Sequence, residues 1–129
     1  MALPFGPLRF LYVGTKDTGR DLDYYTKVLG GTKVWRFKEF GADVAAVRLG
    51  EGPLVLLADH REAPNVMPIF EVEDLTATVK ELKHRGWEPK GGKFEIPNGP
   101  CYVFLDPSGN EYAIFEDVRP GVFGETSKA

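Results

Sequence analysis

Cysteine and histidine are scarce in this chain, which has one cysteine and two histidines among 129 residues. A single cysteine, Cys101, excludes a disulfide within the chain, and its place in an apolar, strand-like run predicts a buried, inert thiol. A nucleophilic role would require a neighbouring base, which the sequence does not reveal. Any site that this chain builds must therefore be poor in histidine.

Long apolar runs and clusters of like charge are also missing. The longest apolar runs span a handful of residues, far short of the roughly 20 needed to cross a membrane. The net charge is −3 and Lys and Arg are not clustered, which argues against a nucleic-acid-binding surface. Residues 1–10 lack the basic and long apolar segments of a signal peptide. We expect a cytoplasmic protein with no nucleic-acid partner and no membrane partner.

Hydrophobic residues make up 43% of the chain and aromatic residues 12%, which is enough for the core of one compact domain. The clearest local signal is residues 102–116, YVFLDPSGNEYAIFE, in which two apolar runs flank the turn DPSGN. Proline presets φ early in a turn, and Gly and Asn tolerate positive φ. Because the flanks are aromatic and β-branched, this stretch predicts a β-hairpin.

An internal repeat relates the two halves of the chain. Residues 45–59 contain a weaker strand, glycine turn and strand, and Gly52 lies 57 residues before Gly109. The same offset relates Asp17 to Asp74. We interpret residues 1–129 as a single domain made of duplicated modules. The modules are residues 8–58 and 66–117, with a linker at 59–65 and a tail at 118–129.

Each module is predicted to contain a strand, a helix and three more strands. In the first, strands are expected at 8–15, 32–37, 42–49 and 53–58, with a helix at 18–29 whose apolar stripe is Leu22, Tyr25, Val28 and Leu29. In the second, strands are expected at 66–72 and 87–96 and in the hairpin, with a helix at 75–85. The pair Gly91-Gly92 leaves the register of strand 87–96 open. The fold class is α+β, with two βαβββ modules whose curved mixed sheets surround a cleft.

Three of these motifs together resemble the vicinal oxygen chelate superfamily, which includes glyoxalase I, bleomycin-resistance proteins and extradiol dioxygenases. They are the first strand followed by Asp17, the pattern Tyr24-Tyr25…Leu29-Gly30, and the DPSGN turn. The resemblance covers residues 8–117. It implies the same paired βαβββ fold, and it implies a homodimer, because members commonly pair.

The resemblance also implies where a divalent metal would bind. Members that are enzymes usually hold it with a His on the first strand of each module and a Glu on the last. Those positions correspond to Phe10 and Met67 for the histidines, and to Leu56 and Ala113 for the glutamates. Such cations need carboxylate, imidazole or thiolate ligands, and a Met thioether suits only Cu(I). We therefore predict no metal and no cofactor, as in the metal-free bleomycin-resistance branch.

Carboxylates are the main polar candidates. Strand alternation places Glu71 on the face of Met67, and Glu111 on the face of Ala113, so both are candidates for the cleft. They would hold a cationic ligand or act as acid and base, unless each is simply solvated near a strand end. Tyr12 is a third polar candidate. His60 is interpreted as a surface residue of the linker, and His84 as a cation at a helix C-terminus.

Aromatic residues complete the candidate site. Trp35 and Phe37 share one strand face, where they would stack on a planar ligand, pack in the core or contact a second chain. Phe70 and Phe104 are expected in the core beneath the helices. The predicted ligand-binding residues are Phe10, Tyr12, Trp35, Phe37, Leu56, Met67, Glu71, Glu111 and Ala113.

Three functions fit these patterns. The first is a metal-free protein that sequesters an apolar or aromatic small molecule, like the bleomycin-resistance proteins. The second is an enzyme, a lyase, isomerase or oxygenase with a relocated metal or a Glu acid–base pair. The third is a non-catalytic interaction module. The apolar metal positions favour the first or third, and the retained aromatic face favours the first over the third.

Overall fold

The computed structural model describes residues 5–39, 41–96 and 98–119. The first half contains β1 (Leu8–Gly14), α1 (Thr18–Asp23), the π-helical turn η1 (Tyr24–Val28), β2 (Thr32–Glu39), β3 (Ala42–Arg48) and β4 (Leu54–Ala58). The second half contains β5 (Val66–Glu71), α2 (Leu75–His84), β6 (Phe94–Ile96), β7 (Gly99–Leu105) and β8 (Glu111–Phe115). The paired βαβββ organisation and the α+β class are confirmed.

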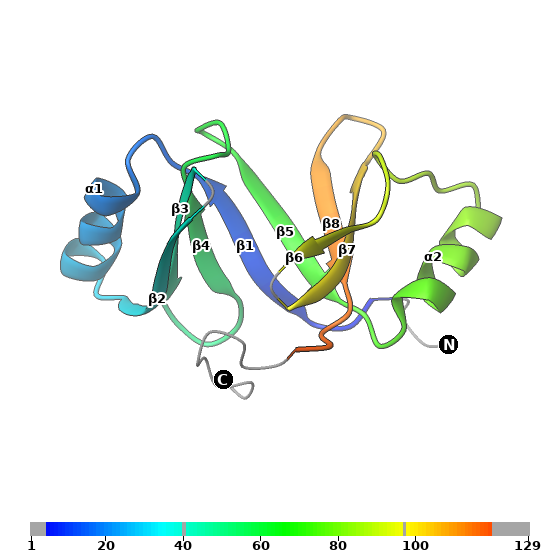
Figure 1. Cartoon of the computed structure of the whole chain (residues 1–129), viewed down its shortest axis with the longest axis horizontal. Helices are drawn as coiled ribbons and strands as arrows, with labels where there is room; N and C mark the ends of the chain where they lie inside the picture. Colours follow the sequence, from blue (N-terminus) through cyan, green and yellow to red (C-terminus); the bar gives the residue numbers. More distant parts are fainter. Residues whose placement is uncertain (1–4, 40, 97, 120–129) are drawn as a thin grey trace.

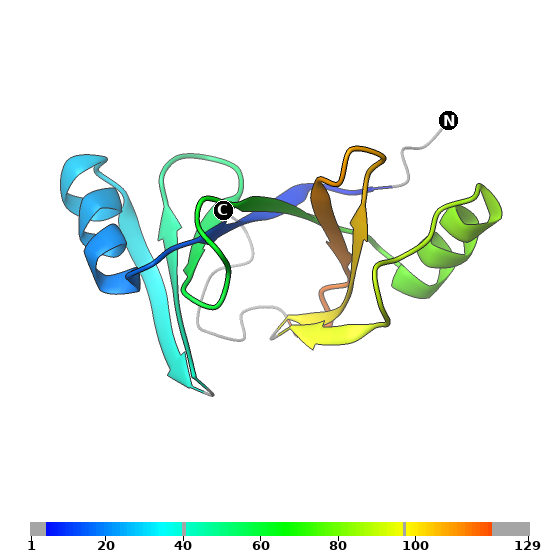
Figure 2. The same cartoon turned by 90° about the horizontal axis from the view of Figure 1, so that it is seen from above.

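The strands form one eight-stranded mixed sheet in the order β2-β3-β4-β1-β5-β8-β7-β6. The helices α1 and α2 lie at opposite ends of the molecule, each outside its own half of the sheet (Figure 1). Seen from above, the sheet curls so that β2 and β6 lie on the same side of the central strands (Figure 2). The concave face therefore lies between the two halves.

The internal repeat is preserved in the strand register. In the parallel pair β1–β4, Tyr12 lies opposite Leu56, and in the parallel pair β5–β8, Ile69 lies opposite Ala113. Both members of the second pair follow those of the first by 57 residues, the offset expected from the sequence. The central strands β1 and β5 are antiparallel, with Tyr12 opposite Met67.

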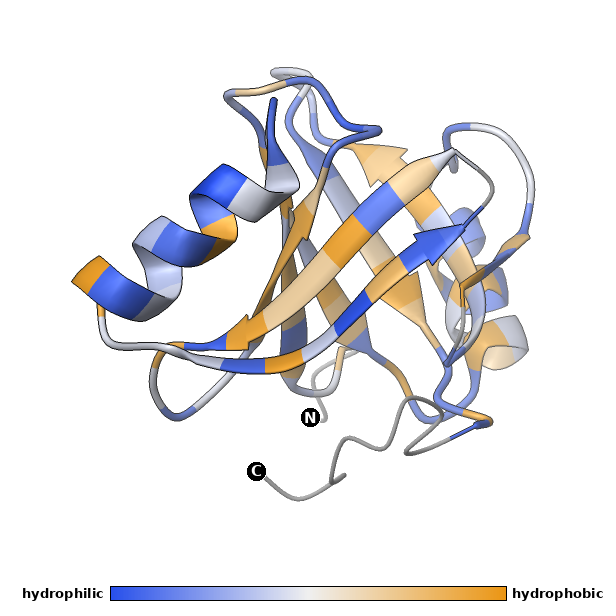
Figure 3. Cartoon of the chain, turned by 60° about the vertical axis from the view of Figure 1, so that its left-hand side comes forward, coloured by the Kyte–Doolittle hydropathy of each residue, from blue (hydrophilic) through white to orange (hydrophobic). Residues whose placement is uncertain are grey.

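Strand alternation divides the core into a shared cluster and two helix-covered clusters. Beneath α1, Leu22 packs on residues of β3 and β4, and beneath α2, a cluster forms around Leu75, Val79 and Leu82. Phe70 and Phe104 pack against the cluster of α2, as expected. The shared cluster lies between the halves and includes residues of β1, β3, β4, β5, β7 and β8. Many residues of the strands are hydrophobic, whereas α1 carries many hydrophilic residues (Figure 3).

The first helix differs from its prediction. Asp17 caps it as expected, but the α-helix ends at Asp23 and continues as a π-helical turn, in which Leu29 N donates to Tyr24 O at 3.1 Å. That bond spans five residues, so the turn is wider than an α-helical one and the side chains leave the apolar stripe. As a result Val28 and Leu29, which were predicted to be buried, are exposed.

The strand predicted at 87–96 is mostly a loop. Phe94–Ile96 is the part that forms a strand with β7, and Pro89 adds an isolated bridge to Phe104. Gly91 has a φ of 80°, which breaks the extended backbone between them. Lys90 N donates to Val103 O at 2.7 Å, so the loop still lies beside β7.

At the start of the predicted tail, the N–H groups of Val118 and Arg119 both donate to Asn98 O. Residues 120–129 of that tail lie outside the described part of the chain. Among the described residues, no helix is long and apolar enough to cross a membrane.

Candidate functional site

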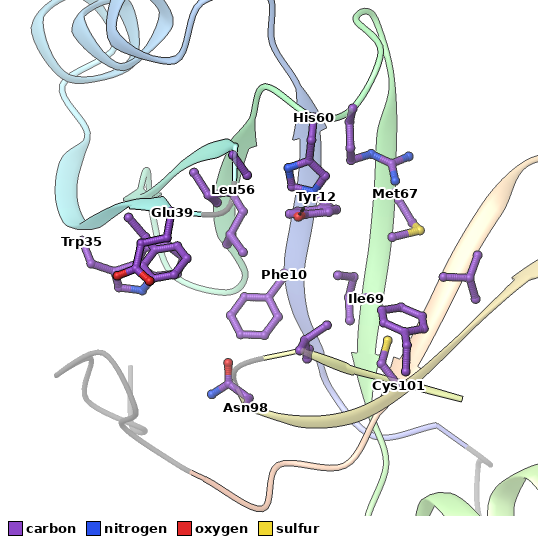
Figure 4. A pocket seen from close by; sticks show the side chains of 17 residues that line it. Phe10, Tyr12, Trp35, Glu39, Leu56, His60, Met67, Ile69, Asn98 and Cys101 are labelled. Carbon is purple, nitrogen blue, oxygen red and sulfur yellow. Dashed lines mark hydrogen bonds between the residues drawn. The ribbon is translucent and has the colours of Figure 1, made fainter. Parts of the chain in front are cut away.

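A cavity of about 390 Å³ lies on the concave face between the two halves of the sheet. Its walls come from β1, β2, β3, β4, β5, β6 and β7 and from the 59–65 linker. Most of the lining is apolar or aromatic, and it includes six of the nine predicted ligand-binding residues: Phe10, Tyr12, Trp35, Phe37, Leu56 and Met67. Figure 4 shows Tyr12 and His60 at one end, Trp35 and Glu39 on a side wall, and Asn98 and Cys101 at the other end.

The four positions that correspond to the metal ligands of the superfamily are brought together, but as apolar packing. Phe10, Leu56, Met67 and Ala113 all belong to the buried cluster of the concave face, and none is more than 9% exposed. Ala113 lies in this cluster rather than in the cavity lining. These side chains offer no carboxylate, imidazole or thiolate, so they do not fit a divalent cation. No group of three or more His, Cys, Asp or Glu residues suited to a metal occurs in the described ranges.

Glu71 and Glu111 do not line the cavity, contrary to the expectation from alternation. Arg9 Nη1 lies 2.5 Å from Glu71 Oε1, because the register shifts between Leu8 and Phe10 and leaves Arg9 as the extra residue of a bulge. Glu71 ends β5 and Glu111 begins β8, and these strands are parallel, so the two carboxylates lie at opposite ends of the pair. They do not form the expected acid–base pair.

The carboxylate of Glu111 pairs with two cationic side chains. Lys90 Nζ and Arg61 Nη2 each donate to it at 2.8 Å, and these hydrogen bonds hold the pKa of Glu111 below its ordinary value. A carboxylate with a lowered pKa is a weak base at neutral pH, so this group is poorly suited to general-base catalysis. Glu111 instead pairs with Arg61 and Lys90 outside the cavity lining.

Of the polar end of the cavity, the sequence analysis named only Tyr12 as a site candidate. Tyr12 Oη and His60 Nε2 form a 2.6 Å hydrogen bond, and Arg61 Cζ lies 5.4 Å from the centroid of the Tyr12 ring. His60 and Arg61 belong to the linker, where polar residues predict an exposed loop. His60 is exposed, as interpreted from the sequence, and Arg61 is partly buried, yet both residues also line the cavity.

Gly14 explains why the linker folds over the end of β1. Its N–H donates to Asn65 O at 2.9 Å, and a Cβ at this position would collide with the carbonyl group of Glu62. Only a residue without a side chain allows so close an approach of two backbone segments. Gly14 at the end of the first strand was the one signal in the sequence that could have indicated this contact.

Burial sets the chemistry of the cavity wall. It raises the pKa of Tyr12 to about 12, an effect that the charge of Arg61 opposes. Burial likewise raises the pKa of the Cys101 thiol to about 12. Both groups keep their protons near neutral pH, so the wall supplies a phenol hydroxyl and an unreactive thiol. The prediction of a buried, inert Cys101 is confirmed.

Solved structures with the same fold are numerous. A methylmalonyl-CoA epimerase from Mycobacterium tuberculosis matches with a TM-score of 0.79 and 16% identity, covering 92% of this chain and 94% of that chain. A Streptomyces coelicolor methylmalonyl-CoA epimerase variant in complex with 2-nitronate-propionyl-CoA matches with a TM-score of 0.73 and 11% identity, covering 89% and 99%. A hypothetical protein from Bacillus halodurans matches with a TM-score of 0.74 and 12% identity, covering 87% and 94%. At these identities the likeness concerns the fold alone.

No curated protein sequence matches the chain significantly. A family model does, that of the Glyoxalase/Bleomycin resistance protein/Dioxygenase superfamily, over residues 8–114. This range includes both βαβββ modules except for the last residue of β8. The chain therefore belongs to the Glyoxalase/Bleomycin resistance protein/Dioxygenase superfamily.

Proposed function

We propose that this protein binds an apolar or aromatic small molecule in the concave cavity without using a divalent metal. One observation carries the proposal: a cavity of about 390 Å³ is lined by apolar side chains at three of the four positions where the superfamily would place metal ligands. The volume lies in the range of known small-molecule sites, roughly 300–1,000 Å³.

The distribution of aromatic residues supports a ligand held between the modules. Trp35 and Phe37 come from β2, at one edge of the sheet, and Phe94 and Ile96 come from β6, at the other edge. A planar molecule between these walls would bury apolar surface against both, which is worth about 25 cal/mol per Å². A concave site of this kind favours a small molecule over the flat surface expected of an interaction module.

An enzyme is the second candidate, and the hydrogen-bonded pair of Tyr12 and His60 in the cavity wall favours it. An imidazole is the side chain most often used as a general base near neutral pH. If the bound molecule is a substrate, mass spectrometry of the molecule recovered after incubation should detect a product. That product should disappear with His60→Ala, whereas binding without conversion supports sequestration.

The homodimer implied by the family resemblance is part of the proposal, as is a cytoplasmic location. Analytical ultracentrifugation of the intact chain measures the first directly. A sedimentation mass of one chain across the working concentration range would remove the dimer from the account.

The binding proposal is tested with N-phenylnaphthylamine, an uncharged aromatic dye whose fluorescence rises in apolar surroundings. We expect saturable binding by the intact protein. Leu56→Trp, which fills the cavity, should lower the affinity at least about tenfold, as expected from the loss of about 1.4 kcal/mol or more. Leu105→Trp makes the same change at an exposed site outside the cavity and should leave the affinity unchanged.

Thermal unfolding of both variants shows whether each remains folded. Because Leu56 is buried, a milder variant, Ala42→Phe, narrows the cavity from its partly buried rim. Absence of dye binding by the intact protein, or equal binding by all the variants, would overturn the proposal.

A further inference from the structure

We infer that the ligand of this cavity carries an acidic group, which Arg61 binds at the end formed by Tyr12 and His60. The inference rests on the proposed function, because it names the class of molecule that the same cavity takes. That class is an organic anion with an apolar or aromatic body, such as an aromatic carboxylate or sulfonate.

The hydrogen bonds of Arg61 leave part of its guanidinium available. Those to Glu111 and Asn65 both start from Nη2. Nε is buried and has no hydrogen-bond partner among the described residues. A buried N–H without a partner costs free energy, and a shift of the Arg61 side chain that brings Nε to an acceptor on a bound ligand would remove that cost. Arg61 lines the cavity and its side chain is 15% exposed, so a ligand at this end can contact the residue.

The local charge balance favours an anion. Arg61 and Lys90 share one carboxylate, that of Glu111, so the three groups together carry a net positive charge. The Arg61 side chain is 15% exposed and that of Lys90 is 57% exposed. Solvent therefore screens Lys90 much more than Arg61, and the unbalanced charge acts mainly at the cavity.

Glu39 is the carboxylate of the cavity lining, and it lies on a different wall, beside Trp35 (Figure 4). It is exposed, so water solvates its charge and weakens its field inside the cavity. A cationic ligand would gain little from Glu39 and would be repelled by Arg61. The buried cation, and not the exposed carboxylate, should therefore set the charge preference of the site.

Tyr12 fixes the position of the guanidinium and adds a second donor. Arg61 packs against the face of its ring, and its hydroxyl keeps a proton near neutral pH. When the Nε2–H of His60 donates to Tyr12 Oη, the hydroxyl hydrogen is free to donate to the ligand. An acidic group at this end would then accept hydrogen bonds from Arg61 and Tyr12, and charge-assisted bonds of this kind are about twice as strong as neutral ones.

A matched pair of dyes tests the inference separately from the proposed function. N-phenylnaphthylamine and anilinonaphthalene sulfonate have the same aromatic frame, and only the second carries an anionic group. With Arg61→Met, we expect the affinity for the sulfonate to fall about tenfold or more and that for the neutral dye less than about threefold. Arg85→Met removes the same charge from the C-terminal end of α2, where Arg85 pairs with Glu81, and should change neither affinity.

A second variant gives a change of the opposite sign. Glu111→Gln removes the carboxylate that competes for Arg61, so the affinity for the sulfonate should rise about threefold or more at low salt, while that for the neutral dye stays constant. This arm remains informative if Arg61→Met fails to fold, which thermal unfolding reports.

If Arg61→Met lowers the affinity for both dyes equally, or if Glu111→Gln does not raise the affinity for the sulfonate, the inference is overturned while the proposed function stays in place. A sulfonate affinity that rises when Glu39→Gln removes the rim carboxylate, but does not respond to Arg61→Met, would also overturn it. Failure of the neutral dye to bind the intact protein would instead overturn the proposed function.

Discussion

The rings of Phe10 and Phe115 lie 5.5 Å apart, centroid to centroid, in the buried cluster of the concave face. By the family resemblance, Phe10 corresponds to a metal-binding histidine of related enzymes, so an aromatic pair lies where we expect the metal ligand of those enzymes. Such pairs contribute about 0.5–1.5 kcal/mol beyond the burial of their surface. The position has become part of the core of this protein, in addition to forming a wall of its cavity.

Truncation of Phe10 should destabilise the fold. Phe10→Ala is expected to lower the free energy of unfolding by about 3–5 kcal/mol, because Phe10 is 2% exposed and its removal leaves a hole in the shared cluster. Urea unfolding measures the change. The control Phe94→Ala, at an exposed position on β6, should cost less than about 1 kcal/mol. Equal small losses in both variants would mean that Phe10 is not a core residue.

Trp35 and Glu71 should differ in their effect on binding. Trp35→Ala removes an aromatic wall of the cavity and should weaken the binding of N-phenylnaphthylamine about tenfold or more. Glu71→Ala removes a carboxylate that pairs with Arg9 and does not line the cavity, so the affinity should stay within about twofold. Fluorescence titration of each variant with the dye measures the two affinities. A larger loss of affinity with Glu71→Ala than with Trp35→Ala would instead place the binding surface at the end of β5, where Glu71 pairs with Arg9.

A methyl group added at Gly14, at the end of β1, should displace the 59–65 linker. Gly14→Ala places a Cβ against the carbonyl group of Glu62, and the strain should lower the free energy of unfolding by about 1–3 kcal/mol. Because the displaced linker carries Arg61, binding of anilinonaphthalene sulfonate should weaken more than binding of the neutral dye. Gly50→Ala meets no atom within 4 Å and serves as the control. The same dye affinities in both variants would contradict the role given to Gly14.

Alkaline pH should destabilise the fold through two protonated groups of the cavity wall. Tyr12 and Cys101 have folded-state pKa values raised to about 12, from ordinary values of 10.0 and 9.0. As the pH rises, the unfolded chain therefore loses these protons at a lower pH than the folded chain does. The contribution of these two groups to the free energy of unfolding is complete below about pH 9 and falls as the pH rises toward 12. For the buried Cys101 the slope is at most about 1.4 kcal/mol per pH unit.

Urea unfolding between about pH 8 and about pH 11 measures this dependence. Cys101→Ala and Tyr12→Phe should each flatten the slope, whereas Tyr24→Phe, at an exposed site, should not. A slope that is unchanged in the first two variants would show that other groups control the alkaline transition.

Local and periodic features of the fold could be predicted from the sequence. The 57-residue repeat, the caps Asp17 and Asp74 and the hairpin around the 106–110 turn are set by neighbouring residues or by strand alternation, and the structure contains them. Six of the candidate residues line one cavity because alternation places them on the shared face. The π-helical turn was not predictable, because apolar spacing alone does not distinguish i+4 from i+5 bonding.

Non-local contacts account for the remaining differences. His60 and Arg61 reach the cavity because a linker folds back over Gly14, and no periodic pattern encodes such an approach. Glu71 pairs with Arg9, which a bulge in β1 brings to it, and alternation does not predict such a bulge. Of the residues at the polar end of the cavity, the sequence analysis therefore named only Tyr12 as a site candidate.

The central claim is that apolar packing has replaced the metal site of the superfamily. The most direct measurement is the metal content of the purified, tag-free protein by inductively coupled plasma mass spectrometry, with and without added Mn, Fe, Ni and Zn. We predict well below one metal ion per chain in every sample, and an N-phenylnaphthylamine affinity that a chelator does not change. A content near one ion per chain of a single metal, removed by the chelator together with dye binding, would contradict the account.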